Sequence, residues 1–183
     1  MRYPADVTAA RHGRILQEAS RLFRERGLNG VSVPEIMKAA KLTHGPFYNH
    51  FASREALVTE VIDRVMGNLA DQISSARNSK AARRQFLDAY LSAEHRDNPG
   101  DGCAIAAFAS DVARNPTAKV PFTRRLKHVL AAVSTKFSSD GKDDSRAEAI
   151  RLVAQIVGAL ILARAVDDSE LSEEILEQTR AAL

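Results

Sequence analysis

The sequence is poor in the residues that cross-link or interrupt a chain. It has one cysteine, Cys103, and no tryptophan, and only nine glycines and six prolines among 183 residues. A single cysteine excludes a disulfide within the chain and is typical of proteins of the reducing cytoplasm, where we expect this one. Hydrophobic residues make up 45% of the chain. Together with the scarcity of helix breakers, this favours an all-α protein with a substantial core.

No hydrophobic run is long enough to cross a bilayer. The most hydrophobic stretch, residues 150–166, holds only twelve residues between Arg151 and Arg164, whereas a membrane-spanning helix needs about 20. This stretch therefore predicts a buried helix. The start of the chain, MRYPADVTAARHGR, has no apolar segment of the kind found in signal peptides. We expect no membrane partner.

The sequence also lacks the common signatures of catalysis. It contains no phosphate-binding loop, no nucleophile elbow and no His/Cys cluster at metal-ligand spacing. His95, Asp97 and Cys103 can be grouped as a Cys-His-Asp set, but such sets arise by chance in many chains. We therefore expect neither an enzyme nor a bound metal or cofactor.

Residues 32–54 have the pattern of a helix-turn-helix. Ser32 and Glu35 have the spacing of a capping box, which predicts a short helix over residues 33–40. Lys41-Leu42 forms a tight connection. A second short helix is expected from Thr43, as its N-cap, through Tyr48. Two short helices joined in this way place the second helix in the major groove of DNA.

A longer stretch, residues 8–57, shows a recurrent set of features. These are a long helix ending in glycine, a Ser/Thr-hydrophobic helix start, an alanine pair, an aromatic-Tyr-x-His-Phe segment and a basic residue opening the next helix. Here they are Phe23 and Gly27, Ser32-Val33, Ala39-Ala40, Phe47-Tyr48-Asn49-His50-Phe51, and Arg54 with Leu57. This stretch resembles the N-terminal domain of TetR-family transcriptional repressors.

Two residues depart from that pattern. Lys41 stands where the family usually has glycine, so the turn must hold a lysine in a left-handed conformation, at a cost of about 1 kcal/mol. Pro46 lies inside the short recognition helix, where it is tolerated only near the first turn. Both departures affect which bases the helix reads rather than the fold.

The resemblance implies an all-α fold of about nine helices in two domains. Residues 1–54 form a three-helix DNA-binding domain, and residues 55–183 form a helical domain for effector binding and dimerisation. The first segment holds nine Lys/Arg against four Asp/Glu, and the second holds seventeen against nineteen. The basic excess therefore lies where phosphate binding requires it. The pattern predicts helices over residues 8–26, 33–40, 43–48, 53–76, 81–95, 103–114, 119–138, 145–166 and 170–182.

The expected DNA contacts follow from the geometry of a recognition helix. Residues at its start meet base edges, and those at its ends meet phosphates. Thr43 and His44 are the expected base readers, with Lys41 at the groove edge and Gly45 allowing close backbone approach. The resemblance implies phosphate contacts for Tyr48 and His50, and the expected donors to the DNA backbone also include Ser32 and Arg54. The alternative makes Tyr48 a packing residue and Arg54 a solvated charge.

The expected helix over residues 145–166 is apolar nearly all round, so more than one side must be covered. A second copy of the same helix is the expected cover, giving a two-fold homodimer interface together with the last helix. The alternative is the core of a monomer. The expected interface residues are Val153, Val157, Leu160, Ile161 and Ile175.

An effector pocket in the second domain is also implied by the resemblance. Its candidate lining residues are Phe86, Tyr90, Cys103, Phe108, Leu126 and Phe137, although aromatic residues at helical spacing are often plain core. Tyr90 is of special interest because a buried hydroxyl needs a partner. The expected ligand is a small hydrophobic effector that releases the protein from a palindromic double-stranded operator.

Cys103 allows a second kind of trigger. It follows Asp101-Gly102, which we expect to cap the next helix, and a helix N-terminus with Arg96 nearby stabilises a thiolate. The alternatives are therefore a thiol sensor of oxidants or electrophiles, or a small residue packed under the helix over 53–76. An architectural DNA-binding protein without an effector has no need of a large apolar second domain.

Overall fold

The computed structural model describes residues 5–43, 45–137 and 145–183. Within these residues every regular element is helical, as nine α-helices and two 3-10 helices, so the predicted all-α fold is confirmed. In chain order they are α1 (Ala5–Arg26), α2 (Val33–Ala39), η1 (Gly45–Asn49), α3 (Arg54–Ser75), α4 (Lys80–Tyr90), α5 (Ala93–Asp97), η2 (Pro99–Asp101), α6 (Ala104–Ala113), α7 (Pro116–Phe137), α8 (Ser145–Ala165) and α9 (Ser169–Ala181).

The first two helices have the caps that the sequence predicts. Ser32 accepts a hydrogen bond from the Glu35 N–H, and the Glu35 carboxylate accepts one from the Ser32 N–H, so the capping box at the start of α2 is confirmed. Gly27 ends α1 with a φ of +78°. Lys41 follows α2 with a φ of 56°, which confirms its left-handed conformation.

The second helix of the motif differs from the prediction. It is the 3-10 helix η1, which begins at Gly45 rather than at Thr43; the expected base reader His44 lies outside the described residues. Pro46 is the second residue of η1 and therefore lies in its first turn, where its missing N–H costs no intrahelical hydrogen bond. Phe47 and Phe51 anchor it, with 0% and 3% of their surface exposed.

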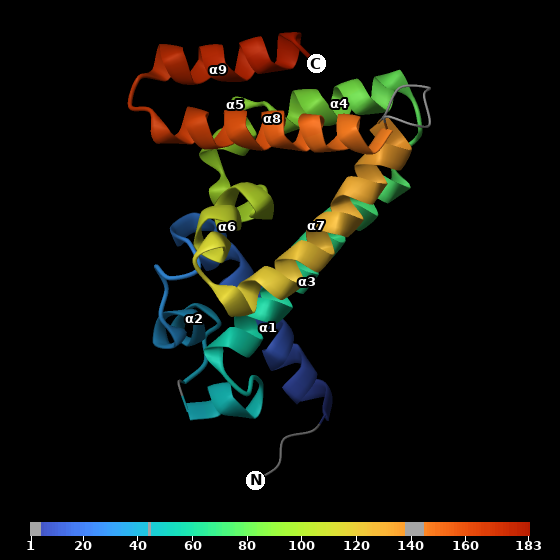
Figure 1. Ribbon diagram of the computed structural model, residues 1–183. Helices are drawn as coiled ribbons and strands as arrows, with labels where there is room; N and C mark the ends of the chain where they lie inside the picture. The colour runs from blue at the N-terminus through green and yellow to red at the C-terminus, as the bar shows by residue number, and fades with distance from the viewer. Residues whose placement is uncertain (1–4, 44, 138–144) are drawn as a thin grey trace.

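Two long helices, α3 and α7, run side by side and join the two ends of the molecule (Figure 1). Ser53 caps α3 as predicted, accepting from the Ala56 N–H at 3.1 Å. Asp63 on α3 lies between Arg124 and Arg125 of α7. Helix α3 begins next to η1 and runs toward the end of the molecule at which α8 and α9 lie, so it connects the two ends (Figure 1).

Three predicted boundaries in the second half are wrong. The single helix expected over 81–95 is broken into α4 and α5, because Ser92 caps α5 by accepting from the His95 N–H at 3.1 Å. The residue at the N-cap position of α6 is Cys103, without a side-chain cap, rather than Asp101-Gly102. Helix α7 starts at Pro116, where Asn115 accepts from the Ala118 N–H.

The last two helices, α8 and α9, pack against each other at the end farthest from α2 (Figure 1). Asp168 caps α9, and the Ser172 hydroxyl donates to the Ala163 carbonyl at 2.7 Å, which fixes the connection between the two helices. None of the helices formed by the described residues has the length and apolarity that crossing a bilayer requires.

Candidate functional site

The surface around η1 presents a small set of exposed polar side chains. Lys41 and Thr43 are exposed, and Tyr48 leaves 68% of its surface in solvent. The Tyr48 ring packs edge-on against buried Phe47, with centroids 5.2 Å apart. An exposed tyrosine on a rigid aromatic base fits a contact residue better than the packing alternative.

Ser32 is exposed, but its hydroxyl is already engaged. It donates to Glu35 Oε2 at 2.7 Å, and Glu35 also pairs with Arg26 at 2.9 Å. Hydrogen bonds from the Ser32 hydroxyl and backbone, followed by the one from Arg26, lower the pKa of Glu35 to about 2. A phosphate contact from Ser32 therefore has to share this hydroxyl with Glu35.

Arg54 is bound to the protein's own backbone. Its Nη2 donates to the carbonyls of Leu28 and Val31, and its guanidinium lies 5.6 Å from the centroid of the Phe23 ring. Arg54 therefore ties the loop after α1 to the start of α3. The solvated-charge alternative does not describe it, and its phosphate contact remains a prediction for its other N–H groups.

His50 belongs to a cluster that the sequence did not reveal. Its ring lies 6.0 Å from that of His12, which stacks on Phe51 at 4.5 Å and bonds Glu60 Oε1 at 2.6 Å. Burial, and then the charges of His12 and Arg11, lower the pKa of His50. A neutral His50 keeps one ring N–H for donation, which is what a phosphate contact needs.

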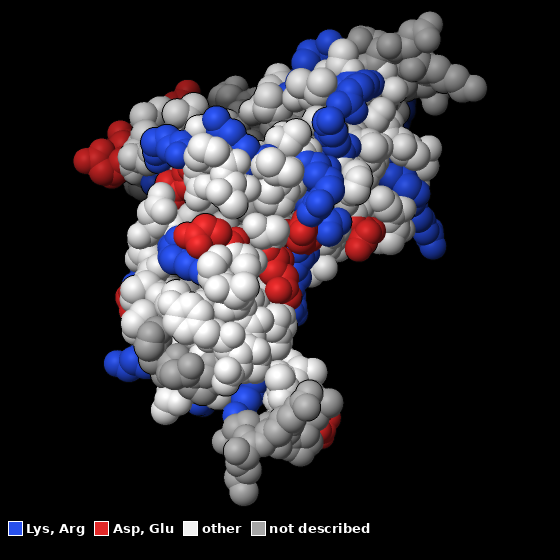
Figure 2. Space-filling view, turned by 60° about the horizontal axis from the view of Figure 1, so that its bottom comes forward, with Lys and Arg blue, Asp and Glu red and all other residues white. Residues whose placement is uncertain are grey.

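Over the part of the chain that the structure describes, the face of the molecule that Figure 2 shows has no single continuous basic patch. Lys and Arg side chains form separate groups interleaved with acidic ones on the face that Figure 2 shows. No group of three or more His, Cys, Asp or Glu side chains among the described residues is placed to hold a metal ion. Individual Lys and Arg side chains and the polar side chains around η1 therefore carry the chemistry of this surface.

A small apolar cavity of about 20 Å³ lies in the second half of the chain, between α3, α4, α7 and α8. It holds little more than one water molecule. Of the candidate lining residues, Phe86, Tyr90 and Cys103 do line it, together with aliphatic residues such as Leu69 and Val133. The sequence missed the aliphatic residues because nothing distinguishes them from ordinary core.

The other three candidates lie apart from the cavity wall. Phe108 is fully buried in the core, Leu126 is partly buried against it, and Phe137 packs on Phe86 with centroids 5.1 Å apart. Phe137 therefore supports a lining residue instead of being one.

Tyr90 is the unusual member of the lining. Only 8% of its surface is exposed, and its hydroxyl has no hydrogen-bond partner among the described residues. Burial, and then the neighbouring Cys103 thiol, raise the pKa of Tyr90 well above its ordinary value. The hydroxyl is therefore a neutral donor with only the weakly accepting Cys103 thiol beside it, so a stronger acceptor bound there would be favoured.

The expected interface residues of α8 and α9 divide into two groups. Leu160 is fully buried and Val153 is 9% exposed within a single chain, while Val157 lines the cavity, so these three pack inward rather than outward. Ile161 is 41% exposed, and Ile175 is half-buried. Other exposed apolar residues of these two helices, which were not among the expected interface residues, are Ile150 and Leu162 on α8 and Leu171 on α9.

Comparison with known proteins identifies the motif and the fold. Residues 15–61 match the model of the bacterial regulatory proteins of the tetR family. The chain is 31% identical over 116 residues to the HTH-type transcriptional repressor KstR2 of Rhodococcus jostii, covering 60% of this chain and 55% of that protein. It is 31% identical over 114 residues to the HTH-type transcriptional repressor DhaR of a Mycobacterium species, covering 62% and 57%. The chain thus spans about half the length of the curated relatives that it matches.

Solved structures extend the likeness to the whole fold. A TetR-family transcriptional regulator from Agrobacterium tumefaciens superposes with a TM-score of 0.79 at 19% identity, over 96% of this chain and 98% of that one. The reduced form of NemR from E. coli gives a TM-score of 0.74 at 20% identity, over 94% of each chain. Residues 15–61 therefore form an N-terminal segment of the tetR family of bacterial regulatory proteins, and the chain as a whole has the fold of TetR-family regulators.

Proposed function

We propose that the protein is a transcriptional repressor that binds a palindromic operator as a homodimer and is released by a small, mainly apolar effector. The observation that carries this proposal is the helix-turn-helix with exposed Lys41, Thr43 and Tyr48 on a buried aromatic base. The relatives KstR2 and DhaR are named as transcriptional repressors, which supports the same activity here.

In this proposal some polar side chains around η1 contact bases and others contact phosphates. Thr43 precedes η1 and meets base edges, where a threonine contacts a thymine methyl, and Lys41 lies at the edge of the groove. Tyr48 and His50 donate to phosphates on either side of the groove. Phosphate contacts set affinity and salt dependence, whereas base contacts set the sequence preference.

The exposed apolar surface of α8 and α9 supports a homodimer. Ile161 and Leu162 are adjacent on α8 and are 41% and 57% exposed, and Leu171 on α9 is 41% exposed. Covering these side chains with the same surface of a second copy gives a self-complementary two-fold interface. A two-fold dimer presents two η1 elements to two half-sites about one helical turn (~34 Å) apart.

The cavity between α3 and α7 supports release by a ligand. It is smaller than any effector, so binding must separate its walls, and α3 is one of them. Because α3 begins at the helix-turn-helix, a ligand that favours one position of α3 changes the spacing of the two η1 elements. A coupling of about 1–3 kcal/mol releases DNA by roughly 5- to 150-fold.

The proposal is tested by selecting duplexes from a random pool and measuring affinity for the best one by fluorescence anisotropy. We expect a palindromic sequence, a stoichiometry of two chains per site, and affinity that falls steeply as salt rises. Equal affinity for the selected and a scrambled duplex at physiological salt overturns the proposal.

A further inference from the structure

A second hollow, of about 280 Å³, adjoins the apolar cavity. The two share Leu69, Tyr90 and Cys103, so the same side chains form a wall of both. Unlike the cavity, the hollow has charged and polar residues in its lining, among them Arg24 and Asp101. An apolar compartment and a polar compartment therefore meet at Tyr90.

Arg24 supplies a poorly compensated cation to the polar compartment. Its side chain is only 15% exposed; its Nε donates to the Gly100 carbonyl at 2.5 Å, and its Nη2 lies 3.6 Å from Asp101 Oδ1. That distance exceeds a hydrogen bond, and the Asp101 side chain is 94% exposed. Burial lowers the pKa of Arg24, but a guanidinium remains charged in proteins.

The Tyr90 hydroxyl supplies a donor at the boundary of the two compartments. His95 holds Tyr90 and Cys103 in place: its Nδ1 is 2.7 Å from the Tyr90 carbonyl, and its Nε2 accepts the Cys103 N–H at 3.0 Å. With both ring nitrogens engaged by the backbone, His95 has nothing to offer the Tyr90 hydroxyl. The Cys103 thiol beside that hydroxyl is only a weak acceptor, so a bound molecule with an oxygen acceptor would form a stronger hydrogen bond with it.

We infer that the effector is a small apolar carboxylic acid whose hydrocarbon part occupies the apolar cavity and whose carboxylate binds Arg24, with the Tyr90 hydroxyl as a second donor. This inference rests on the proposed function and specifies its ligand. A planar guanidinium and a carboxylate form two parallel N–H···O bonds, which a neutral or cationic head group cannot reproduce. The carboxylate takes the place of the loosely held Asp101.

The position of Arg24 in the chain gives this ligand a direct route to the DNA-binding half. Arg24 belongs to α1, whereas Gly100 and Asp101 belong to η2. A carboxylate bound to Arg24 changes the contact between α1 and η2. The signal therefore enters the helix-turn-helix through α1 as well as through α3.

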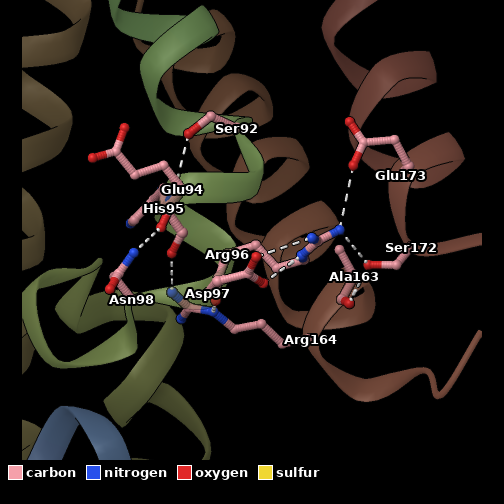
Figure 3. Close-up of polar contacts among 10 residues, drawn as sticks. All are labelled: Ser92, Glu94, His95, Arg96, Asp97, Asn98, Ala163, Arg164, Ser172 and Glu173. Carbon is pink, nitrogen blue, oxygen red and sulfur yellow. Dashed lines mark hydrogen bonds and ion pairs between the residues drawn. The ribbon is translucent and has the colours of Figure 1, made fainter. Parts of the chain in front are cut away.

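The part of the hollow's lining that α5 supplies is held in place by α8 and α9. Arg164 of α8 donates through Nη2 to the His95 carbonyl at 2.6 Å and through Nε to the Arg96 carbonyl at 2.9 Å. Arg96 in turn reaches Ser172 and Glu173 of α9, as Figure 3 shows. Because α5 is fixed to the two last helices, α1 is the element expected to move when the ligand binds.

The test compares octanoate with octan-1-ol, which share a hydrocarbon part and differ in the head group. Affinities are measured by isothermal titration calorimetry on the full chain without DNA. We expect octanoate to bind at least about tenfold more tightly, the usual effect of a hydrogen-bonded charge. Comparable affinity for the alcohol, or no binding of octanoate, overturns the inference.

Three substitutions assign the carboxylate to its partner. Arg24→Gln is expected to weaken octanoate by about tenfold or more and to leave octan-1-ol unchanged, and Asp101→Asn is expected to tighten octanoate because it removes a competing carboxylate. Arg21→Gln is the matched control, since it removes an α1 charge that pairs with Glu18 and Glu25 outside the hollow. Unchanged octanoate affinity in Arg24→Gln overturns the inference. If Arg24→Gln does not fold, the Asp101→Asn variant provides the test. Weaker or unchanged octanoate binding in Asp101→Asn then overturns the inference.

Failure of this inference is distinguishable from failure of the proposed function. A protein that prefers its operator but does not bind octanoate remains a regulator with a different effector, and the inference is overturned. A protein that binds octanoate through Arg24 but has no preferred duplex keeps the ligand site and loses the proposed function.

Discussion

Asp63 of α3 accepts a hydrogen bond from Arg125 of α7 at 2.8 Å, and Arg124 approaches the same carboxylate at 2.7 Å. Burial alone would raise the pKa of Asp63, but the hydrogen bonds from the two arginines outweigh it and the pKa is lowered. One carboxylate thus bridges to two arginines across the interface between the two helices that link the ends of the molecule.

The lowered pKa of Asp63 gives a pH-dependent contribution to stability. Because the folded-state pKa lies below the unfolded value, the contribution is present above the ordinary aspartate range and is lost as pH falls through the folded pKa. We expect Asp63→Asn to lower the free energy of unfolding by about 1 kcal/mol at pH 7, since the pair is partly exposed. Urea denaturation at pH 7 and below pH 3 measures this, with Asp71→Asn on the same helix as control. A difference from the wild type that stays the same at both pH values contradicts this account.

Tyr48 and Phe47 are neighbours with opposite roles. Tyr48→Ala is expected to weaken binding to all duplexes alike, by about 1 kcal/mol or fivefold, without changing thermal stability. Phe47→Ala leaves a hole under η1 and should lower the free energy of unfolding by about 3–5 kcal/mol. Anisotropy and thermal melts on both variants separate these effects. A loss of stability in Tyr48→Ala equal to that in Phe47→Ala would instead identify Tyr48 as a packing residue.

Ile161 faces outward on α8, whereas the adjacent Leu160 is fully buried. Ile161→Asp would bury an unpaired charge between two copies, at a cost of several kcal/mol, and we expect a folded monomer at micromolar concentration. Sedimentation velocity gives the oligomeric state, and circular dichroism checks the fold. Thr123→Asp, an exposed position on α7, is the control and should remain a dimer. A wild type that sediments as a monomer rules the interface out.

Cys103 is 8% exposed and lies against Tyr90 at the junction of the cavity and the hollow. We expect Cys103→Ser to bind the operator and to respond to a reversible effector as the wild type does. The measurement is operator release by the compound that most stabilises the protein in a thermal-shift screen. If the variant binds the operator but is no longer released by that compound, covalent modification of the Cys103 thiol is the trigger. Reversible binding in the pocket is then not the trigger.

The sequence predicted best where the interactions are local. The capping box joins Ser32 to Glu35 over three positions, and the left-handed Lys41 follows from a turn that needs glycine, so both were visible without the fold. The break at Ser92 was not predicted, because the residues around it also suit one continuous helix. Helix α5 is stabilised by Arg164, nearly seventy positions away, which no local pattern reveals.

The residues of the candidate site were likewise predictable only where the pattern that marks them is local in the sequence. Tyr48 and Lys41 could be identified from a motif of adjacent residues. Arg24 could not, because its role depends on Gly100 and Asp101, which the fold brings to the end of α1. The inward placement of Leu160 was missed for a similar reason: a helix that is apolar all round does not indicate which side its own chain covers.

The backbone N–H and carbonyl of Leu28 are held by different parts of the chain. Its N–H donates to Asp111 Oδ2 of α6 at 2.7 Å, and its carbonyl accepts from Arg54 at the start of α3. Exposure of the Leu28 N–H requires loss of its bond to Asp111, so the Leu28 amide should exchange with deuterium more slowly than a free loop amide, and faster in Asp111→Ala. Residues 1–54 alone would lack Asp111 and almost all of α3, and should not form an independent cooperative unit.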